Sequence, residues 1–335
     1  DLSYDDAQNQ KYFEHNYLGT DSIDKTKRTS IKNTIGIALQ EGFNKWAKAG
    51  LTAFLSYEYR NFALTDTTNI PGQRIINNYK ESSLSIGGEL SKKQGKLLHY
   101  NILGELAIAG EDAGQFSVEG RGDLNLRLFG DTVRLDVNAF IKNQNPVFYF
   151  RHFQSKHYWW DNNDLSKIMR TRLEGKLSLD RWGTQLRAGV ENIKNYTYLA
   201  NTSIPVKDSE GNVTGFKNNA AVRQHSGNIQ IFTAMLQQKL KVGIFHLDGE
   251  VAYQKSSEQD ILPLPELSAY GNLYMKFGLA KKVLQIEMGA DVRYFSKYYA
   301  PDYSPVIGQF YNQNPDDKIE IGAFPIVNVY ANLHL

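Results

Sequence analysis

The feature that most constrains the fold is a strict alternation of apolar and polar residues between positions 116 and 142. From Phe116 to Leu126 the apolar side chains occupy even positions, and from Val133 to Ile141 they occupy odd positions. Since successive side chains on a β-strand point to opposite faces, the pattern predicts a hairpin with one apolar and one charged face. Strands in soluble sheets average about 5–6 residues. A tilted strand that crosses a bilayer needs roughly 9–11, and these strands are that long.

The composition agrees with membrane-crossing strands and excludes several other classes. The 335 residues include 38 Lys and Arg against 36 Asp and Glu, so the charge balance gives no reason to expect a nucleic-acid partner. The mean hydropathy of −0.47 excludes helical membrane spans. The chain has no cysteine, which excludes disulfide scaffolds and thiolate metal sites. We expect no catalytic residues, no metal and no cofactor.

The same alternation recurs along the whole chain and predicts thirteen amphipathic strands. They lie near residues 35–39, 49–60, 84–90, 98–108, 116–128, 133–142, 169–177, 186–190, 228–240, 245–254, 273–279, 284–294 and 327–335. In the ninth of these segments Ile229 and Ile231 have the opposite parity to Leu236 and Leu240, a switch that a β-bulge would explain. The sequence therefore predicts an all-β fold, a transmembrane antiparallel up-and-down β-barrel.

The connections between these strands alternate between short and long, except that the link at 109–115 is brief where a long one would fall. Tight turns are expected near residues 42, 94, 130, 182, 242 and 281, and long links near 61–78, 143–163, 195–223, 255–268 and 297–320. Bacterial outer-membrane barrels have short periplasmic turns and longer extracellular loops. We therefore predict a location in the bacterial outer membrane, in contact with lipid and lipopolysaccharide.

Aromatic residues gather at the predicted strand ends. Amphipathic rings favour the depth of the lipid headgroups, so we expect two aromatic girdles. Their members would be Trp46, Tyr57, Tyr59, Trp182, Tyr196, Tyr253 and Tyr294.

The strand number is odd, whereas single-chain bacterial barrels have an even number. We therefore interpret residues 1–335 as a single barrel domain that is incomplete at both ends and lacks an odd number of strands in total.

The charged faces of the strands are the candidate functional surface. Barrels of about eight strands are packed solid, whereas roughly sixteen or more leave a water channel. A lumen lined by charges would tune the passage of ions and solutes. The pore-lining candidates are Glu58, Arg60, Glu105, Glu119, Arg121, Asp123, Arg127, Arg134, Asp136, Arg170, Arg172, Glu174, Arg187, Glu191, Asp248, Glu250, Glu287, Asp291 and Arg293.

Two interpretations of these charges stay open. They select solutes, or they pair across neighbouring strands and hold the wall together. A basic patch would combine Arg121, Arg127, Arg134, Arg170 and Arg172. We favour the alternative for this set, in which the arginines are interleaved with Glu119, Asp123, Asp136 and Glu174.

Two histidines lie close together in the predicted loop 143–163. His152 and His157, beside Trp159 and Trp160, could bind a metal or a sugar. We favour instead an aromatic loop that packs into the mouth of the barrel. No motif fixes a Ser, His and acid set, so we do not expect an enzyme.

Several short runs resemble a known family. The segments at 262–267 (LPLPEL) and 270–274 (YGNLY) resemble the porins of Bacteroidetes outer membranes, as do 299–303 (YAPDY) and 308–311 (GQFY). The segment at 189–196 (GVENIKNY) is also similar to TonB-dependent receptor barrels. The resemblance is strongest over 160–335. It implies a general diffusion channel with more strands than this chain supplies.

Four functions are compatible with the sequence. The leading hypothesis is a passive outer-membrane channel for ions and small hydrophilic solutes. The second is the barrel part of a TonB-dependent receptor, and the third is a soluble β-sandwich or propeller that binds a ligand. The fourth is a barrel that serves as a scaffold for other outer-membrane proteins, with loops 143–163 and 195–223 as contacts.

Overall fold

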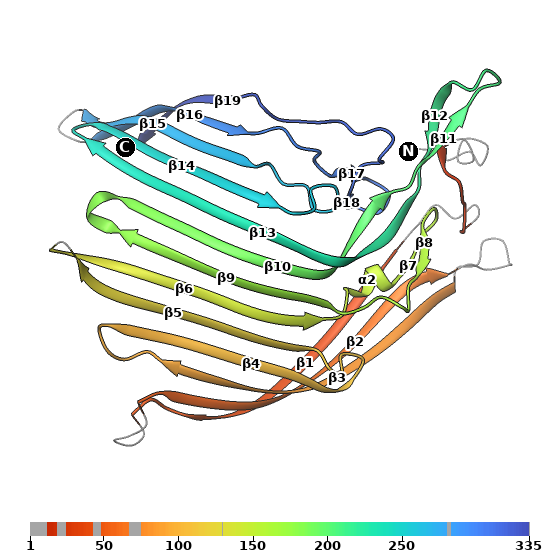
Figure 1. Ribbon diagram of the computed structural model, residues 1–335, viewed down its shortest axis with the longest axis horizontal. Coiled ribbons are helices and arrows are strands. Elements are labelled where there is room, and N and C mark those ends of the chain that lie inside the picture. Colours follow the sequence, from red (N-terminus) through yellow and green to blue (C-terminus); the bar gives the residue numbers. More distant parts are fainter. Residues whose placement is uncertain are drawn as a thin grey trace.

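Thirteen long strands form one antiparallel sheet in which each strand pairs with its neighbour along the chain (Figure 1). The computed structural model describes residues 12–18, 25–42, 48–66, 75–128, 130–279 and 283–334. The all-β class and the antiparallel order predicted from the alternation are confirmed. The described long strands lie in one sheet and do not form a two-sheet sandwich.

The main strands are longer than most strands of soluble proteins. They are β1 (Lys27–Leu39), β2 (Gly50–Asp66), β3 (Ile75–Lys92), β4 (Leu98–Gly110), β5 (Phe116–Leu128), β6 (Asp131–Gln144), β9 (Ile168–Leu179), β10 (Thr184–Asn201), β13 (Ala220–Val242), β14 (Phe245–Ser256), β15 (Leu267–Leu279), β16 (Leu284–Phe295) and β19 (Ile326–His334). The connections contain α2 (Phe148–Arg151), β7 (His152–Gln154), β8 (Trp159–Asp161), η1 (Asp180–Trp182), β11 (Ile204–Lys207), β12 (Val213–Lys217), β17 (Asp302–Ser304) and β18 (Gln309–Tyr311).

No helix in the described part of the chain is both long and apolar enough to span a membrane.

Short turns and long connections lie at opposite ends of the sheet, as the sequence predicts (Figure 1). At the short-turn end, Gly183 and Gly243 adopt the left-handed conformation, with φ of 62° and 59°. Glycine takes this conformation without the steric cost that a Cβ adds. The predicted turn at 281 lies outside the described residues.

Two of the predicted long loops are shorter than the sequence suggests. The ladder between β2 and β3 continues to the pair Asp66 and Ile75, so most of the segment 61–78 is strand. In the same way β10 extends to Asn201, and β13 begins at Ala220. Apolar alternation ends before these extensions, but the backbone hydrogen bonds of the ladder do not require it.

One face of the sheet is apolar across neighbouring strands. In register, Leu124 pairs with Leu135, Leu135 with Leu177, and Leu177 with Leu186. The side chains on this face are highly exposed, with Ile37 at 77% and Val329 at 83%. Soluble proteins rarely expose such a continuous apolar surface. A lipid environment accounts for it, because hydrocarbon chains then cover the apolar side chains.

The suggested bulge does not explain the parity of Ile229 and Ile231. The register of β13 with β10 is regular from Asn228 to Gln238. Both isoleucines therefore lie on the charged face, and Ile229 is fully buried there. The register irregularity lies between Lys194 and Tyr196 of β10, which pair with Asn228 and His225 of β13. It therefore precedes both isoleucines in β13.

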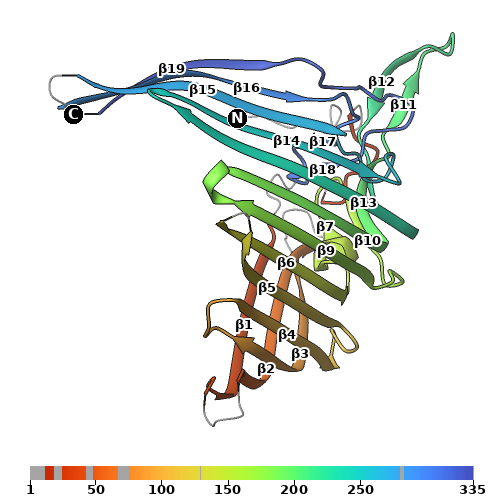
Figure 2. The ribbon, with the colours of Figure 1, turned by 60° about the vertical axis from the view of Figure 1, so that its left-hand side comes forward.

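The sheet has two open edges. Among the described strands β1 and β19 each pair on one side only, and they lie at the two ends of the curved sheet (Figures 1 and 2). Every residue of β1 is exposed. Because thirteen strands alternate in direction, β1 and β19 both run from the long-loop end to the short-turn end.

Candidate functional site

The charged face is the concave face of the sheet. Lys32 in β1 and Glu105 in β4 are three strands apart, yet Nζ lies 3.8 Å from Oε1. Neighbouring strands are about 4.8 Å apart, so these side chains meet because the sheet bends toward them. The register brings the predicted pore-lining residues to this same face, from Glu58 in β2 to Arg293 in β16. That they line a pore stays a prediction.

Many of the predicted charges form ion pairs across or along the strands. Arg170 lies 2.5 Å from Glu191, and Arg172 contacts Glu174 and Glu191. Asp136 accepts contacts from Arg134 at 3.3 Å and Lys176 at 3.0 Å. These arginines are therefore interleaved with acids.

Arg121 and Arg127 form no ion pair with any residue in the described part of the chain, so their charges stay available on the concave face.

The connection between β6 and β9, residues 145–167, folds back onto this concave face. The ring of Phe148 stacks on Phe62 of β2 at 3.7 Å, with an interplanar angle of 6°. His152 stacks on Tyr79 of β3 at 5.0 Å. Phe62, Leu64 and Phe148 form a small buried apolar cluster. The segment thus covers part of the inner wall at the long-loop end.

An ion-pair network fixes the same segment. Arg151 donates to Glu81 and to Glu111, both at 2.7 Å. Arg60 lies 3.1 Å from Glu81 and 2.7 Å from Asp112. The Glu81 side chain is only 7% exposed. Removing one member of a buried pair leaves a charge without compensation, which is strongly destabilising.

The long connections also contact one another and the segment 12–18. Phe13 stacks on His157 at 3.9 Å, and the Tyr17 amide donates to the Lys156 carbonyl at 2.8 Å. The His157 ring bonds to the His15 carbonyl at 2.9 Å. Both histidines of the predicted loop site are therefore engaged in packing, since His152 also contacts Asp161 at 2.5 Å.

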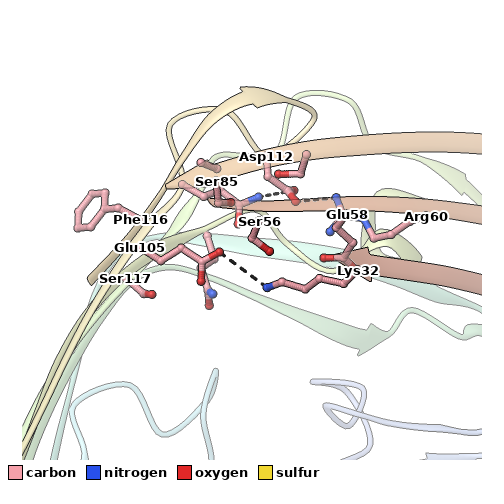
Figure 3. Close-up of a pocket in the computed structure, with 13 residues that line it drawn as sticks. Lys32, Ser56, Glu58, Arg60, Ser85, Glu105, Asp112, Phe116 and Ser117 are labelled. Carbon is pink, nitrogen blue, oxygen red and sulfur yellow. Dashed lines mark hydrogen bonds and ion pairs between the residues drawn. The ribbon is translucent and has the colours of Figure 1, made fainter. Parts of the chain in front are cut away.

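A polar cavity of about 230 Å³ lies in the concave wall beside this network (Figure 3). Its polar lining includes the carboxylates Glu58, Glu105 and Asp112, the cations Lys32 and Arg60, and the hydroxyls of Ser56, Ser83, Ser85 and Ser117. Phe116 borders the cavity, but its ring points away from it (Figure 3). The cavity is therefore a hydrophilic site.

Sequence reasoning predicted Glu58, Arg60 and Glu105 but missed their partners. The alternation of residues in β1 could have placed Lys32 on the charged face, where it pairs in register with Glu58. No signal marked Glu81 and Arg151, because their contact joins the wall to a loop that is 70 positions away in sequence.

The predicted girdle residues differ in how exposed their side chains are. Tyr57 and Tyr253 are exposed large apolar side chains, and Trp182 is exposed at the short-turn end. Tyr59 and Tyr294 are half-buried, and Tyr196 stacks on Tyr198 at 5.9 Å. Trp46 lies outside the described residues. The girdle stays a prediction.

A single sheet of long antiparallel strands, apolar on its convex face and charged on its concave face, defines a bacterial outer-membrane β-barrel protein. The model of the family described as "Putative porin" matches residues 1–335, and the chain belongs to this family. The family resemblance predicted from short sequence runs is confirmed, and so is the outer-membrane location. No curated protein sequence matches the chain significantly.

Solved structures show the same fold at low sequence identity. The copper transporter OprC superposes with a TM-score of 0.57 at 13% identity, over 92% of this chain and 50% of that chain. The ferric enterobactin receptor PfeA, from Pseudomonas aeruginosa, gives 0.56 at 13% identity, over 91% and 46%. The siderophore receptor PirA from Acinetobacter baumannii gives 0.55 at 10% identity, over 92% and 48%.

This chain spans about half the length of these solved proteins. At such low identity the likeness concerns the fold alone. It agrees with the similarity to TonB-dependent receptor barrels predicted from the sequence.

Proposed function

We propose that the chain forms part of the wall of an outer-membrane channel through which ions and small hydrophilic solutes diffuse passively. The observation that carries this proposal is the division of the sheet into two faces. Apolar side chains such as Ile37 cover the convex face, whereas ion-paired and free charges cover the concave face. A charged face needs water or protein against it, and an aqueous lumen provides the water.

The segment 145–167 supports this proposal. It occupies the concave face at the long-loop end, where it contacts β2 and β3. A segment in this place narrows the path of a solute without filling the whole concavity. The free guanidinium of Arg121 and the paired carboxylates would then act on passing ions through the local potential.

The open edges favour a barrel with further strands. β1 and β19 run in the same direction. Antiparallel closure therefore requires an odd number of additional strands between them. We interpret residues 1–335 as one incomplete barrel domain, in contact with lipid and lipopolysaccharide. We also propose that the protein comes from a member of the Bacteroidetes.

Planar-bilayer recording tests the channel. We expect stepwise conductance with a linear current–voltage relation and no need for an energy source. Folded, inserted protein that conducts nothing would overturn the proposal and favour a scaffold for other outer-membrane proteins. Folding is checked independently by heat-modifiable migration on gels.

A second candidate is the barrel part of an energised receptor. It is favoured by the likeness of the fold to the siderophore receptors and the copper transporter. Swelling of liposomes that contain the protein separates the two. Uptake of neutral sugars without an energised partner supports the channel, whereas its absence together with tight binding of one ligand supports the receptor.

A further inference from the structure

Two hydroxyl groups in the lining of the polar cavity are free to bind a solute. Ser83 and Ser85 line it and are only 5% and 9% exposed. Neither hydroxyl forms a hydrogen bond with any residue that the structure describes. Neither oxygen is fully enclosed, so both hydroxyls can bond to a polar molecule that enters the cavity.

One carboxylate of the cavity is also weakly engaged. Asp112 is held by Arg60 at 2.7 Å and Gln115 at 2.5 Å, and Glu58 accepts from Ser30 at 2.7 Å. Glu105 has a single partner in the described structure, the Lys32 ammonium at 3.8 Å.

The Lys32 ammonium occupies the place that a solute cation would take. Its side chain is 51% exposed and belongs to the open edge strand β1. An exposed ion pair of this kind contributes little to stability, so a second ammonium group can displace it.

We propose that this cavity binds small hydroxylated solutes that carry an ammonium group. Glu105 pairs with the ammonium, and Ser83 and Ser85, which also line the cavity, bond to the neighbouring hydroxyls. The volume of about 230 Å³ lies below the roughly 300–1,000 Å³ of sites for drug-sized ligands. It therefore suits a solute of monosaccharide size. The inference rests on the proposed function, since the solute reaches the concave face through the lumen.

Binding is measured by titration calorimetry on the detergent-solubilised protein, with glucosamine as the probe at mildly acidic pH. Glucose, which lacks the ammonium, is the matched neutral compound. We expect Glu105→Gln to weaken glucosamine binding about tenfold, the size of a lost hydrogen bond to a charged group. The binding of glucose should not change.

The chain offers a closely matched control. Glu287 also lies on the concave face and pairs with a lysine, Lys276, at 3.3 Å. The exposures of this pair, 50% and 23%, are close to the 51% and 29% of Lys32 and Glu105. Glu287→Gln should leave glucosamine binding unchanged. Lys32→Gln should strengthen binding, because it removes the competing ammonium.

These measurements distinguish a failure of the binding-site proposal from a failure of the proposed channel function. Equal affinity for glucosamine and glucose would overturn the proposed binding site even if the protein conducts. Equal losses of glucosamine affinity in Glu105→Gln and Glu287→Gln would do the same. Selective binding of glucosamine that depends on Glu105 supports the proposed binding site even if bilayer recordings show no conductance. Each variant must keep the heat-modifiable migration of the parent protein.

Discussion

At the scale of single residues, the two faces of the sheet impose opposite requirements. Val137 and Asn138 are neighbours at the centre of β6, yet they point to opposite faces. Val137 pairs with Gly122 and Gly175 on the apolar face. Asn138 pairs with Arg121 and Glu174 on the charged face. The same substitution should therefore have different effects at these two positions.

We expect Val137→Arg to destabilise the folded protein by about 2–4 kcal/mol, the cost of arginine on the lipid face at the bilayer midplane. Asn138→Arg should fold normally, because its side chain remains in water. Urea unfolding in lipid vesicles measures both variants. Equal destabilisation of the two would mean that the convex face does not contact lipid.

A glycine in the wall shows how close the concave packing is. A Cβ added at Gly87 would lie 2.2 Å from Cζ of Phe54 and 2.7 Å from the Gly104 carbonyl oxygen. We expect Gly87→Ala to cost about 1–3 kcal/mol through overpacking. The control is Gly104→Ala, where an added Cβ meets nothing within 4 Å. Thermal unfolding of both variants measures the difference in stability. Similar melting temperatures would show that the wall around Gly87 is not closely packed.

At the scale of elements, the segment 145–167 is attached to the wall mainly through α2. Its contacts combine the stacked ring of Phe148 with the ion pairs of Arg151. Neither contact follows from the strand pattern, which ends at Gln144 and resumes at Ile168. The position of this segment on the concave face is therefore a tertiary property.

Phe148→Ala should release the segment from β2 and increase the single-channel conductance, because the path beside the wall widens. Phe153→Ala is the control, since Phe153 stacks on Trp160 within the segment at 4.8 Å. Bilayer recording compares the two variants. An unchanged conductance in Phe148→Ala would show that the segment does not narrow the lumen.

Tyr158 connects two of the long connections. It is 3% exposed and shares a hydrogen bond with Ser304 of β17. Burial raises the pKa of Tyr158 to about 12, and nearby Tyr311 adds to the effect. The folded state thus holds this proton more tightly than the unfolded state does. The stabilisation is complete below the unfolded value of about 10 and is lost as the pH rises toward about 12.

We therefore expect the β17–β18 hairpin to lose hydrogen-exchange protection between about pH 10 and pH 12. Tyr158→Phe, which cannot ionise, should lose this pH dependence and show slightly lower protection at neutral pH. The lost hydrogen bond accounts for about 0.5–1.5 kcal/mol. Identical pH profiles of the variant and the parent protein would assign the transition to another group.

At the scale of the whole molecule, the open edges are the feature with the largest consequence. Among the described strands β1 and β19 run in the same direction and each pairs on one side only, and unpaired edges template pairing with another strand. Within a bilayer an unpaired edge is more costly still, because no water reaches its backbone groups. We expect further strands to separate these two edges in the membrane.

Disulfide cross-linking tests this arrangement without interference, since the chain has no native cysteine. The double variant Ile37→Cys and Ala53→Cys joins register partners of β1 and β2 and should cross-link in native membranes. The double variant Ile37→Cys and Val329→Cys should not. A β1–β19 disulfide within one molecule would show that thirteen strands close by themselves.

Much of the fold follows from local pattern alone. The period of two is sufficient to assign Glu58, Arg60 and Arg293 to one face, since it needs no tertiary contact. The strand limits are less well predicted, because extensions such as 61–66 continue the ladder although their apolar residues Phe62 and Leu64 lie on the concave face. The isoleucines Ile229 and Ile231 mislead for the same reason, since they are apolar residues on the charged face.

Local sequence thus specifies which side chains share the apolar face and which share the charged face, because the direction of a side chain on a strand depends only on its parity. Which charges meet is specified only by the folded chain. Lys32 reaches Glu105, and Arg151 reaches Glu81, because the sheet curves and a distant loop folds onto it. Curvature and loop placement depend on contacts between segments far apart in the chain, and no local period encodes them.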